Sequence, residues 1–164
     1  MHTAAAVLPT PCQSDLETLV ARMRREIPLT AAMDLHAGTL DAAGLVLRAP
    51  LAPNRNDKGC AFGGSLVSLM TLAAWALVEL QLRARGWHCE VYVQDSQVDY
   101  LTPVWGELHA RAQLDAGEDW DAFFTTLAAR GKGRLRLRAQ IEHAGIVAAR
   151  LQARFVAKRV EDAR

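Results

Sequence analysis

The chain has 164 residues, of which 51% are hydrophobic, and its 19 basic and 18 acidic residues leave a formal net charge of +1. This length and apolar content suit one domain with a substantial core, and the near-neutral charge argues against a nucleic-acid or membrane-surface role. The three cysteines lack CxxC spacing and the five histidines lack metal-ligand spacing. We therefore expect no disulfide framework and no metal site, and the free thiols fit a reducing cytoplasm.

The first part of the chain predicts an arm, a helix and a hairpin. Residues 1–13 carry Pro9 and Pro11 without any periodicity, which is typical of a flexible arm, and they contain no recognisable signal peptide. Ser14 and Glu17 match a capping box, and the apolar residues that follow at helical spacing up to Pro28 predict an amphipathic helix. The alternating segments 32–40 and 45–49, separated by a turn at 41–44, predict a β-hairpin.

Residues 54–83 combine a polar, glycine-containing loop (54–64) with an almost wholly apolar helix (65–83). A helix that is apolar on every side must be buried, and the polar residues within it leave no run of the ~20 apolar residues that a bilayer requires. Gly63 and Gly64 at its start allow another group to approach the backbone closely. Because the first turn of a helix has free N–H groups and a partial positive charge, this point can polarise a carbonyl or hold an anion.

The rest of the chain predicts strands at 89–100, 107–114, 134–143 and 146–158, with a short helix at 119–129 and a tight turn at 144–145. The apolar parity changes near Asp95 and Ser96, which indicates a bulge or polar side chains that turn inward. Most strands have one apolar and one polar face. The pattern therefore predicts an α+β domain over residues 14–164, in which an antiparallel sheet packs on a helix.

This element order resembles the hotdog fold, in which an antiparallel sheet wraps around a long central helix. Residues 56–64 resemble the Asn-x-x-Gly-x-x-His-Gly-Gly stretch of hotdog acyl-CoA thioesterases of the phenylacetate-pathway type, with Asn56, Gly59, Gly63 and Gly64 matching. Residues 100–103 resemble the Tyr-x-x-Pro of the same family. The segment 50–64 is still more similar to the thioesterase-like domain that some bacteria fuse behind an acetyltransferase domain.

The resemblance implies a cytoplasmic bacterial enzyme of fatty acid metabolism that hydrolyses an acyl thioester of coenzyme A or acyl carrier protein. Coenzyme A would enter only as part of the substrate, with no other cofactor. The resemblance also implies a homodimer or a dimer of dimers, with active sites at the dimer interface. The Gly64 N–H would hold the oxyanion, Asn56 would orient the thioester or water, and Asp57 or Asp95 would act as base or nucleophile. The expected substrate-binding residues are Gly63, Ser65, Phe62, Thr71, Gln94, Ser96, Arg130 and Lys132.

Two departures from the family pattern leave alternatives open. Phe62 replaces the family's loop histidine, and Thr71 stands where the family has its helix carboxylate. Asn56 can instead cap its own loop, Asp57 can be a solvated charge, and Asp95 can be an edge charge. A non-catalytic module that binds acyl-CoA or acyl carrier protein is therefore the alternative function. A hydratase or dehydratase is disfavoured, since it needs a well-placed histidine and acid.

Overall fold

The structure, a computed structural model, describes residues 10–160, so residues 1–9 of the expected arm lie outside the described part. The helices are α1 (Gln13–Glu26), α2 (Pro28–Ala32), the short 3-10 turn η1 (Ala52–Asn54), α3 (Gly63–Ala84) and α4 (Trp120–Arg130). The strands are β1 (His36–Asp41), β2 (Gly44–Ala49), β3 (Cys89–Tyr100), β4 (Leu108–Leu114), β5 (Lys132–His143) and β6 (Ile146–Arg159).

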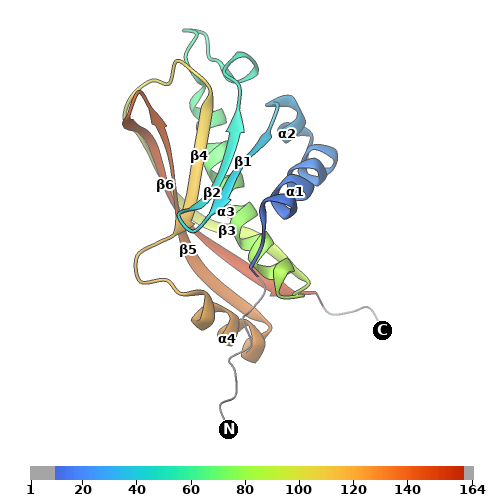
Figure 1. The fold of residues 1–164 in the computed structure, drawn as a ribbon. Coiled ribbons are helices and arrows are strands. Elements are labelled where there is room, and N and C mark those ends of the chain that lie inside the picture. The colour runs from blue at the N-terminus through green and yellow to red at the C-terminus, as the bar shows by residue number, and fades with distance from the viewer. Residues whose placement is uncertain (1–9, 161–164) are drawn as a thin grey trace.

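All six strands form one antiparallel sheet in the order β1-β2-β4-β5-β6-β3. Figure 1 shows this sheet curving around α3, with α1 and α2 beyond β1 and α4 at the lower end of β5. α3 packs most extensively against β2, β3, β4, β5 and β6. The predicted α+β hotdog architecture is confirmed, and β3 and β1 are the two edges of the sheet.

α3 is the core helix of the domain. Its length and composition would allow it to cross a membrane, but 61% of its most apolar window is buried within the fold. Its one buried carboxylate, Glu79, accepts hydrogen bonds from Arg22 and Arg83, each at 2.9 Å. The apolar surface of α3 is therefore covered mainly by the sheet and by α1, as its composition predicts.

One face of α3 remains partly open. Gly64, Ser68, Thr71 and Trp75 are half-buried, and their spacing of four, three and four residues places them on one side of the helix. The indole Nε1 of Trp75 donates a hydrogen bond to the Val91 carbonyl on β3 at 3.2 Å. This face, which we call the open stripe, therefore runs from the start of α3 towards the edge strand β3.

The first helix begins differently from the sequence prediction. It starts at Gln13, and its N-terminal carboxylate is Asp15, which accepts a hydrogen bond from the Cys12 backbone N–H at 2.8 Å. This hydrogen bond lowers the pKa of Asp15 below its ordinary value. The capping box is therefore formed by Cys12 and Asp15, two residues before the predicted pair of Ser14 and Glu17. The prediction was wrong because a cysteine at the N-cap is a weaker sequence signal than a serine.

The predicted strand at 32–40 is also wrong in its first half. Pro28 follows the end of α1 and is the first residue of α2. Proline is tolerated there because the N–H groups of the first helical turn have no partner within the helix. The chain then turns at Asp34, which has a φ of 54°. Arg24 donates hydrogen bonds to the Asp34 carboxylate and the Leu35 carbonyl, both at 2.8 Å, and the first of these helps to hold the pKa of Asp34 below its ordinary value.

The predicted bulge in β3 is confirmed. Val93 pairs with Phe155 and Asp95 pairs with Arg154, so Gln94 is the additional residue. The two-residue turn at Ala144 and Gly145 is confirmed as well, with φ values of 51° and 79°. The bulge decides which side chains of β3 face α3, which matters for the site described next.

Candidate active site

The loop before α3 is closed by backbone hydrogen bonds. Arg55 forms an antiparallel bridge with Ala61, and the Asn56 N–H donates to the Cys60 carbonyl at 2.7 Å. The Phe62 N–H donates to the Asn54 carbonyl at 2.7 Å, and the Ala61 N–H donates to the Val104 carbonyl at 2.8 Å. The loop is therefore a small, ordered hairpin that fixes the direction in which the chain enters α3.

Asn54 ties this loop to the rest of the domain. Its side chain is buried, and its Nδ2 donates to the Met33 carbonyl at 2.8 Å and to the Pro50 carbonyl at 2.7 Å. The sequence pattern does not distinguish this residue from the rest of its loop. Its partner Met33 lies 21 residues away, so the sequence around Asn54 does not indicate this contact. The only local signal is its position in a run of prolines and polar residues.

The start of α3 presents two free N–H groups. The N–H groups of Ser65 and Leu66 both donate to the Phe62 carbonyl, at 2.9 and 3.1 Å. Gly63 and Gly64 find no acceptor within residues 10–160, and no side chain caps the helix. Two unpaired donors at the positive end of a 22-residue helix suit an incoming carbonyl oxygen or anion.

Aromatic side chains surround these donors. A Cβ atom placed on Gly64 would lie 2.2 Å from Cε1 of Phe62, and one on Gly63 would lie 3.4 Å from Cε1 of Tyr100. Phe62, Tyr100 and Trp105 are 56%, 56% and 58% exposed, and Leu101 is also exposed. The helix start is therefore flanked by an exposed apolar rim. In the sequence, Tyr100 stands out only as part of the Tyr-x-x-Pro pattern, and nothing marks Trp105.

The polar loop residues make local contacts. The Asn56 Oδ1 accepts from the Lys58 N–H at 2.8 Å, and its Nδ2 donates to the Cys60 Sγ at 3.2 Å. Both polar ends of Asn56 are thus used to shape the loop. The Asp57 side chain is 80% exposed and pairs with the Lys58 Nζ at 3.0 Å. Such an exposed pair contributes little to stability, so Asp57 can move at low energetic cost.

The candidates on β3 lie on different faces of the sheet. Asp95 is opposite Arg154, with 3.5 Å between their polar atoms, and Gln94 accepts a hydrogen bond from Arg134 at 3.0 Å. Because side chains alternate along a strand and the neighbours of Arg154 are buried against α3, Asp95 points away from the helix. Ser96 is opposite the buried Ala153 and therefore faces the helix side, as does Tyr100.

The remaining predicted site residues lie in two different parts of the molecule. Ser65 and Thr71 are half-buried on α3, Ser65 in its first turn and Thr71 on the open stripe. Arg130 and Lys132 are exposed at the end of α4 and the start of β5. Lys132 pairs with Lys158, which pairs with Glu90 at the opposite end of β3 from Tyr100. One chain therefore does not bring these two cations to the helix start.

The part of the chain that the structure describes contains no group of three or more His, Cys, Asp or Glu side chains arranged to hold a metal ion. The groups that this part of the molecule offers are the N–H donors of the helix start, the hydroxyl groups on the open stripe and the carboxylate of Asp57 in the preceding loop.

Comparison with known structures points to one superfamily. A protein of unknown function from Chlorobaculum tepidum superimposes with a TM-score of 0.85 and 25% identity, covering 92% of this chain and 99% of its own. A structure from Shewanella oneidensis, described as a putative thioesterase, matches with a TM-score of 0.78 and 25% identity, covering 87% and 96%. A Haemophilus influenzae thioesterase shares the fold, with a TM-score of 0.72 and 14% identity over 96% and 98% of the two chains.

The sequence itself carries the assignment. Residues 16–159 match the family model described as "Putative thioesterase (yiiD_Cterm)". This match includes the loop 54–62, all of α3 and all six strands. The chain therefore belongs to this thioesterase family of hotdog proteins.

Proposed function

We propose that this protein hydrolyses acyl thioesters of coenzyme A or acyl carrier protein at the start of α3. The observation that carries the proposal is the pair of free N–H groups on Gly63 and Gly64, which point out of the positive end of a buried helix. Membership of a thioesterase family supports the same chemistry. The protein would act in the cytoplasm, in fatty acid metabolism, with coenzyme A only as part of its substrate.

The proposed reaction uses these donors to stabilise developing charge. The thioester carbonyl oxygen accepts a hydrogen bond from the Gly64 N–H, and a water attacks the carbonyl carbon while a carboxylate base takes one of its protons. The carbon–sulfur bond then breaks, and the base returns this proton to the sulfur, which leaves as a thiol. Removing one such oxyanion donor typically lowers kcat by a factor of ~10²–10³. The hydroxyl groups of Ser68 and Thr71, on the same stripe as Gly64, position the water, while Phe62 and Tyr100 hold the acyl group.

We assign the role of base to Asp57 rather than Asp95. Asp57 belongs to the loop that leads into α3, and only a weak, exposed contact with Lys58 holds it elsewhere. Asp95 points to the opposite face of the sheet and pairs with Arg154. Asn56 supports Asp57 by fixing the turn in which it lies, through its contacts with Lys58 and Cys60.

The site is completed by a second copy of the chain. β3 is an edge strand with exposed apolar side chains, among them Tyr92 (55%) and Val93 (46%). Antiparallel pairing of two β3 strands covers this edge and the open stripe. It also places the start of one β3 beside the end of the other, so Arg130 and Lys132 approach the helix start of the second copy and can meet phosphates of coenzyme A. A dimer of dimers extends the same arrangement.

The experiment that tests the location of the site is free-thiol release by two glycine variants. Gly64→Ala forces the Phe62 ring aside, whereas Gly63→Ala introduces only a tight contact with Tyr100. Because a displacement of about 1 Å can lower the rate ~100-fold, we expect kcat to fall at least tenfold in Gly64→Ala and less in Gly63→Ala. An undiminished kcat in both variants would place the chemistry elsewhere.

The alternative function, a non-catalytic binding module, keeps one specific observation in its favour. Thr71 occupies the helix position where the family has a carboxylate, and Asp57 is mostly exposed in the single chain. Such a module would bind acyl-CoA or acyl carrier protein at the same helix start without releasing thiol.

A further inference from the structure

The open stripe of α3 ends at Trp75. From Gly64 to Trp75 its residues are half-buried, whereas Val78 and Leu82, further along the same side of the helix, are 0% and 1% exposed. Residues 63–78 of α3 contain no Asp, Glu, Lys or Arg. The partly open side of the helix is therefore uncharged, begins at the free N–H groups and stops at a single tryptophan.

The edge strand β3 is also uncovered on the side that faces the helix. Val93 and Ser96 lie opposite the buried Phe155 and Ala153 of β6, so their side chains point to the helix side of the sheet. Val93 is nevertheless 46% exposed, and Ser96 is exposed as well. α3 thus leaves the middle of this strand uncovered.

Two contacts join the helix and the strand at either end of this uncovered region. The Tyr100 ring lies beside Gly63, and the Trp75 Nε1 donates a hydrogen bond to the Val91 carbonyl at 3.2 Å. Between these contacts the helix rises only about 18 Å, whereas the strand advances about 25–30 Å. β3 therefore cannot follow α3 closely over this distance. We call the uncharged surface between the two contacts, formed by the open stripe and the middle of β3, the α3–β3 strip.

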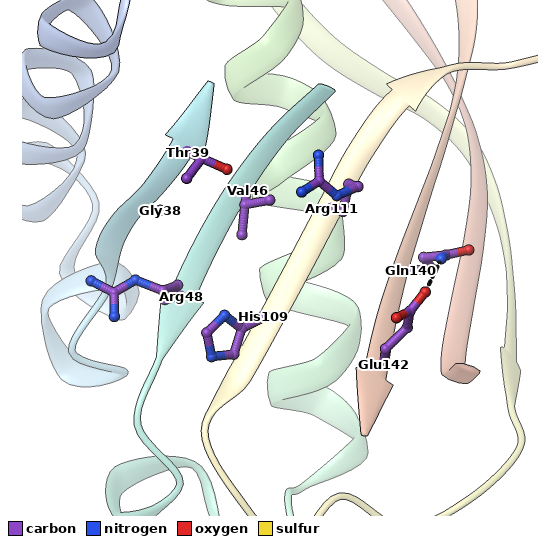
Figure 2. A pocket seen from close by; sticks show the side chains of 8 residues that line it. All are labelled: Gly38, Thr39, Val46, Arg48, His109, Arg111, Gln140 and Glu142. Atoms are coloured by element: carbon purple, nitrogen blue, oxygen red, sulfur yellow. Dashed lines mark hydrogen bonds between the residues drawn. The ribbon is translucent and has the colours of Figure 1, made fainter. Parts of the chain in front are cut away.

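The sheet separates the helix start from the cavity on its outer face. This cavity of about 550 Å³ lies across β1, β2, β4 and β5, and Figure 2 shows α3 behind the strands. Its two arginines, Arg48 and Arg111, are already paired with Glu107 and Asp41. An apolar chain that starts at Gly64 therefore follows the α3–β3 strip rather than this charged cavity.

We propose that Trp75 determines the length of the acyl chain that the site accepts. The proposal rests on the proposed thioesterase function. The thioester carbonyl is held at Gly64, and the acyl chain passes Tyr100 and extends along the α3–β3 strip until it meets the Trp75 indole. The hydrogen bond to Val91 holds this indole across the end of the strip. The second copy that pairs with β3 covers the bound chain from the outside.

The geometry of α3 gives the expected chain length. The helix rises about 16 Å from Gly64 to Trp75, and a helical side chain covers roughly the turn that precedes its own Cα, about 5 Å. An extended carbon chain advances about 1.2 Å per bond, as the polypeptide backbone does. The remaining length therefore suits acyl chains of about eight to ten carbons.

The test is kcat/KM for thiol release from a series of saturated thioesters, from butyryl-CoA to palmitoyl-CoA. In the wild type each buried methylene should raise kcat/KM about fourfold. The rise should stop at about eight to ten carbons, which we call the chain-length limit. Trp75→Ala frees one helical turn and should move this limit up by about four carbons. Its effect should be smallest on butyryl-CoA, whose chain does not reach the indole.

Three further variants check the direction of the effect. Leu72→Trp places an indole one turn nearer to Gly64 and should lower the limit by about four carbons. Trp75→Phe keeps most of the wall and should shift the limit less than Trp75→Ala does. Trp120→Ala removes another half-buried tryptophan, at the start of α4, and should leave the limit unchanged.

Three outcomes overturn the proposal: an unchanged limit in Trp75→Ala, an equal shift in Trp120→Ala, or a kcat/KM that falls equally at every chain length. Calorimetric affinities for the same acyl-CoA series separate this result from thioester hydrolysis. A limit in affinity that moves in Trp75→Ala, without thiol release, supports the role of Trp75 and contradicts the thioesterase function. Thiol release with a limit that does not move contradicts only the role of Trp75.

Discussion

The two asparagines before α3 hold their loop in different ways. Asn54 is buried and joins the loop to two distant backbone carbonyls, those of Met33 and Pro50. Asn56 stays within the loop and bonds to Lys58 and Cys60. The position of the free N–H groups at the helix start therefore depends on Asn54, and the local shape of the turn that carries Asp57 depends on Asn56.

We expect Asn54→Ala to lower the free energy of unfolding by about 1–3 kcal/mol, because it leaves the Met33 and Pro50 carbonyls without a donor. Asn56→Ala is the matched control. It should lower the free energy by about 0.5–1.5 kcal/mol, as a partly exposed hydrogen bond does. Urea unfolding measures the loss in each variant, provided that the dependence of the unfolding free energy on urea concentration is the same as in the wild type. Equal losses in the two variants would contradict the anchoring role of Asn54.

The two aspartates give the sharpest prediction at the scale of single residues. Asp57→Asn removes the proposed base and should reduce kcat for thioester hydrolysis by a factor of ~10²–10⁴. Asp95→Asn, which changes a partly exposed pair with Arg154, should leave kcat within a factor of about two. The measurement is thiol release under saturating substrate. Loss of activity in Asp95→Asn alone would show that the base comes from β3.

At the scale of elements, α1 is fastened to α3 by a buried carboxylate. Glu79 is the partner of both Arg22 on α1 and Arg83 on its own helix, at 2.9 Å each. Replacing Glu79 by Ala leaves two cations with less compensation, so we expect a loss of about 3 kcal/mol or more in unfolding free energy. Glu26→Ala, which removes a long 3.8 Å contact with the same Arg22, should cost under about 0.5 kcal/mol. Comparable losses in thermal or urea unfolding would contradict this account.

The elements also show what alternation and spacing can predict. β5 alternates strictly and β6 does so from Ala149 onwards, after an irregularity at Ala148, and both were predicted within two residues of their bounds. β3 was predicted as a strand with a bulge, but the face of the sheet on which the Asp95 side chain lies was not predicted. One additional residue at Gln94 reverses every later side chain, so alternation cannot tell which half faces the helix.

The candidate site was predicted only where it is continuous in sequence. The loop, the glycine pair and the helix that follows them were found because they lie within one stretch. Asn54 and Trp105 were missed because their roles depend on contacts with distant segments: Asn54 with Met33, and Trp105 with the loop at Gly59. A single sequence contains no local signal for such contacts.

At the scale of the whole molecule, β3 leaves an exposed apolar edge that a second copy is expected to cover. Val93→Lys places a charge on this edge, which is a natural means of preventing strand pairing. We expect this variant to sediment as a monomer and to lose thioesterase activity. Val160→Lys, a similarly exposed residue just beyond β6, should remain a dimer. A wild-type monomer at micromolar concentration with full activity would contradict a shared site.

Thioester hydrolysis at the start of α3 is tested by the release of free thiol from a panel of acyl-CoA and acyl carrier protein thioesters. We expect multiple turnovers by the wild-type chain, with kcat in the usual range of about 1–10³ s⁻¹ for its best substrate. Stoichiometric binding of an acyl-CoA with no thiol release from any member of the panel would contradict it, and would identify the protein as a binding module.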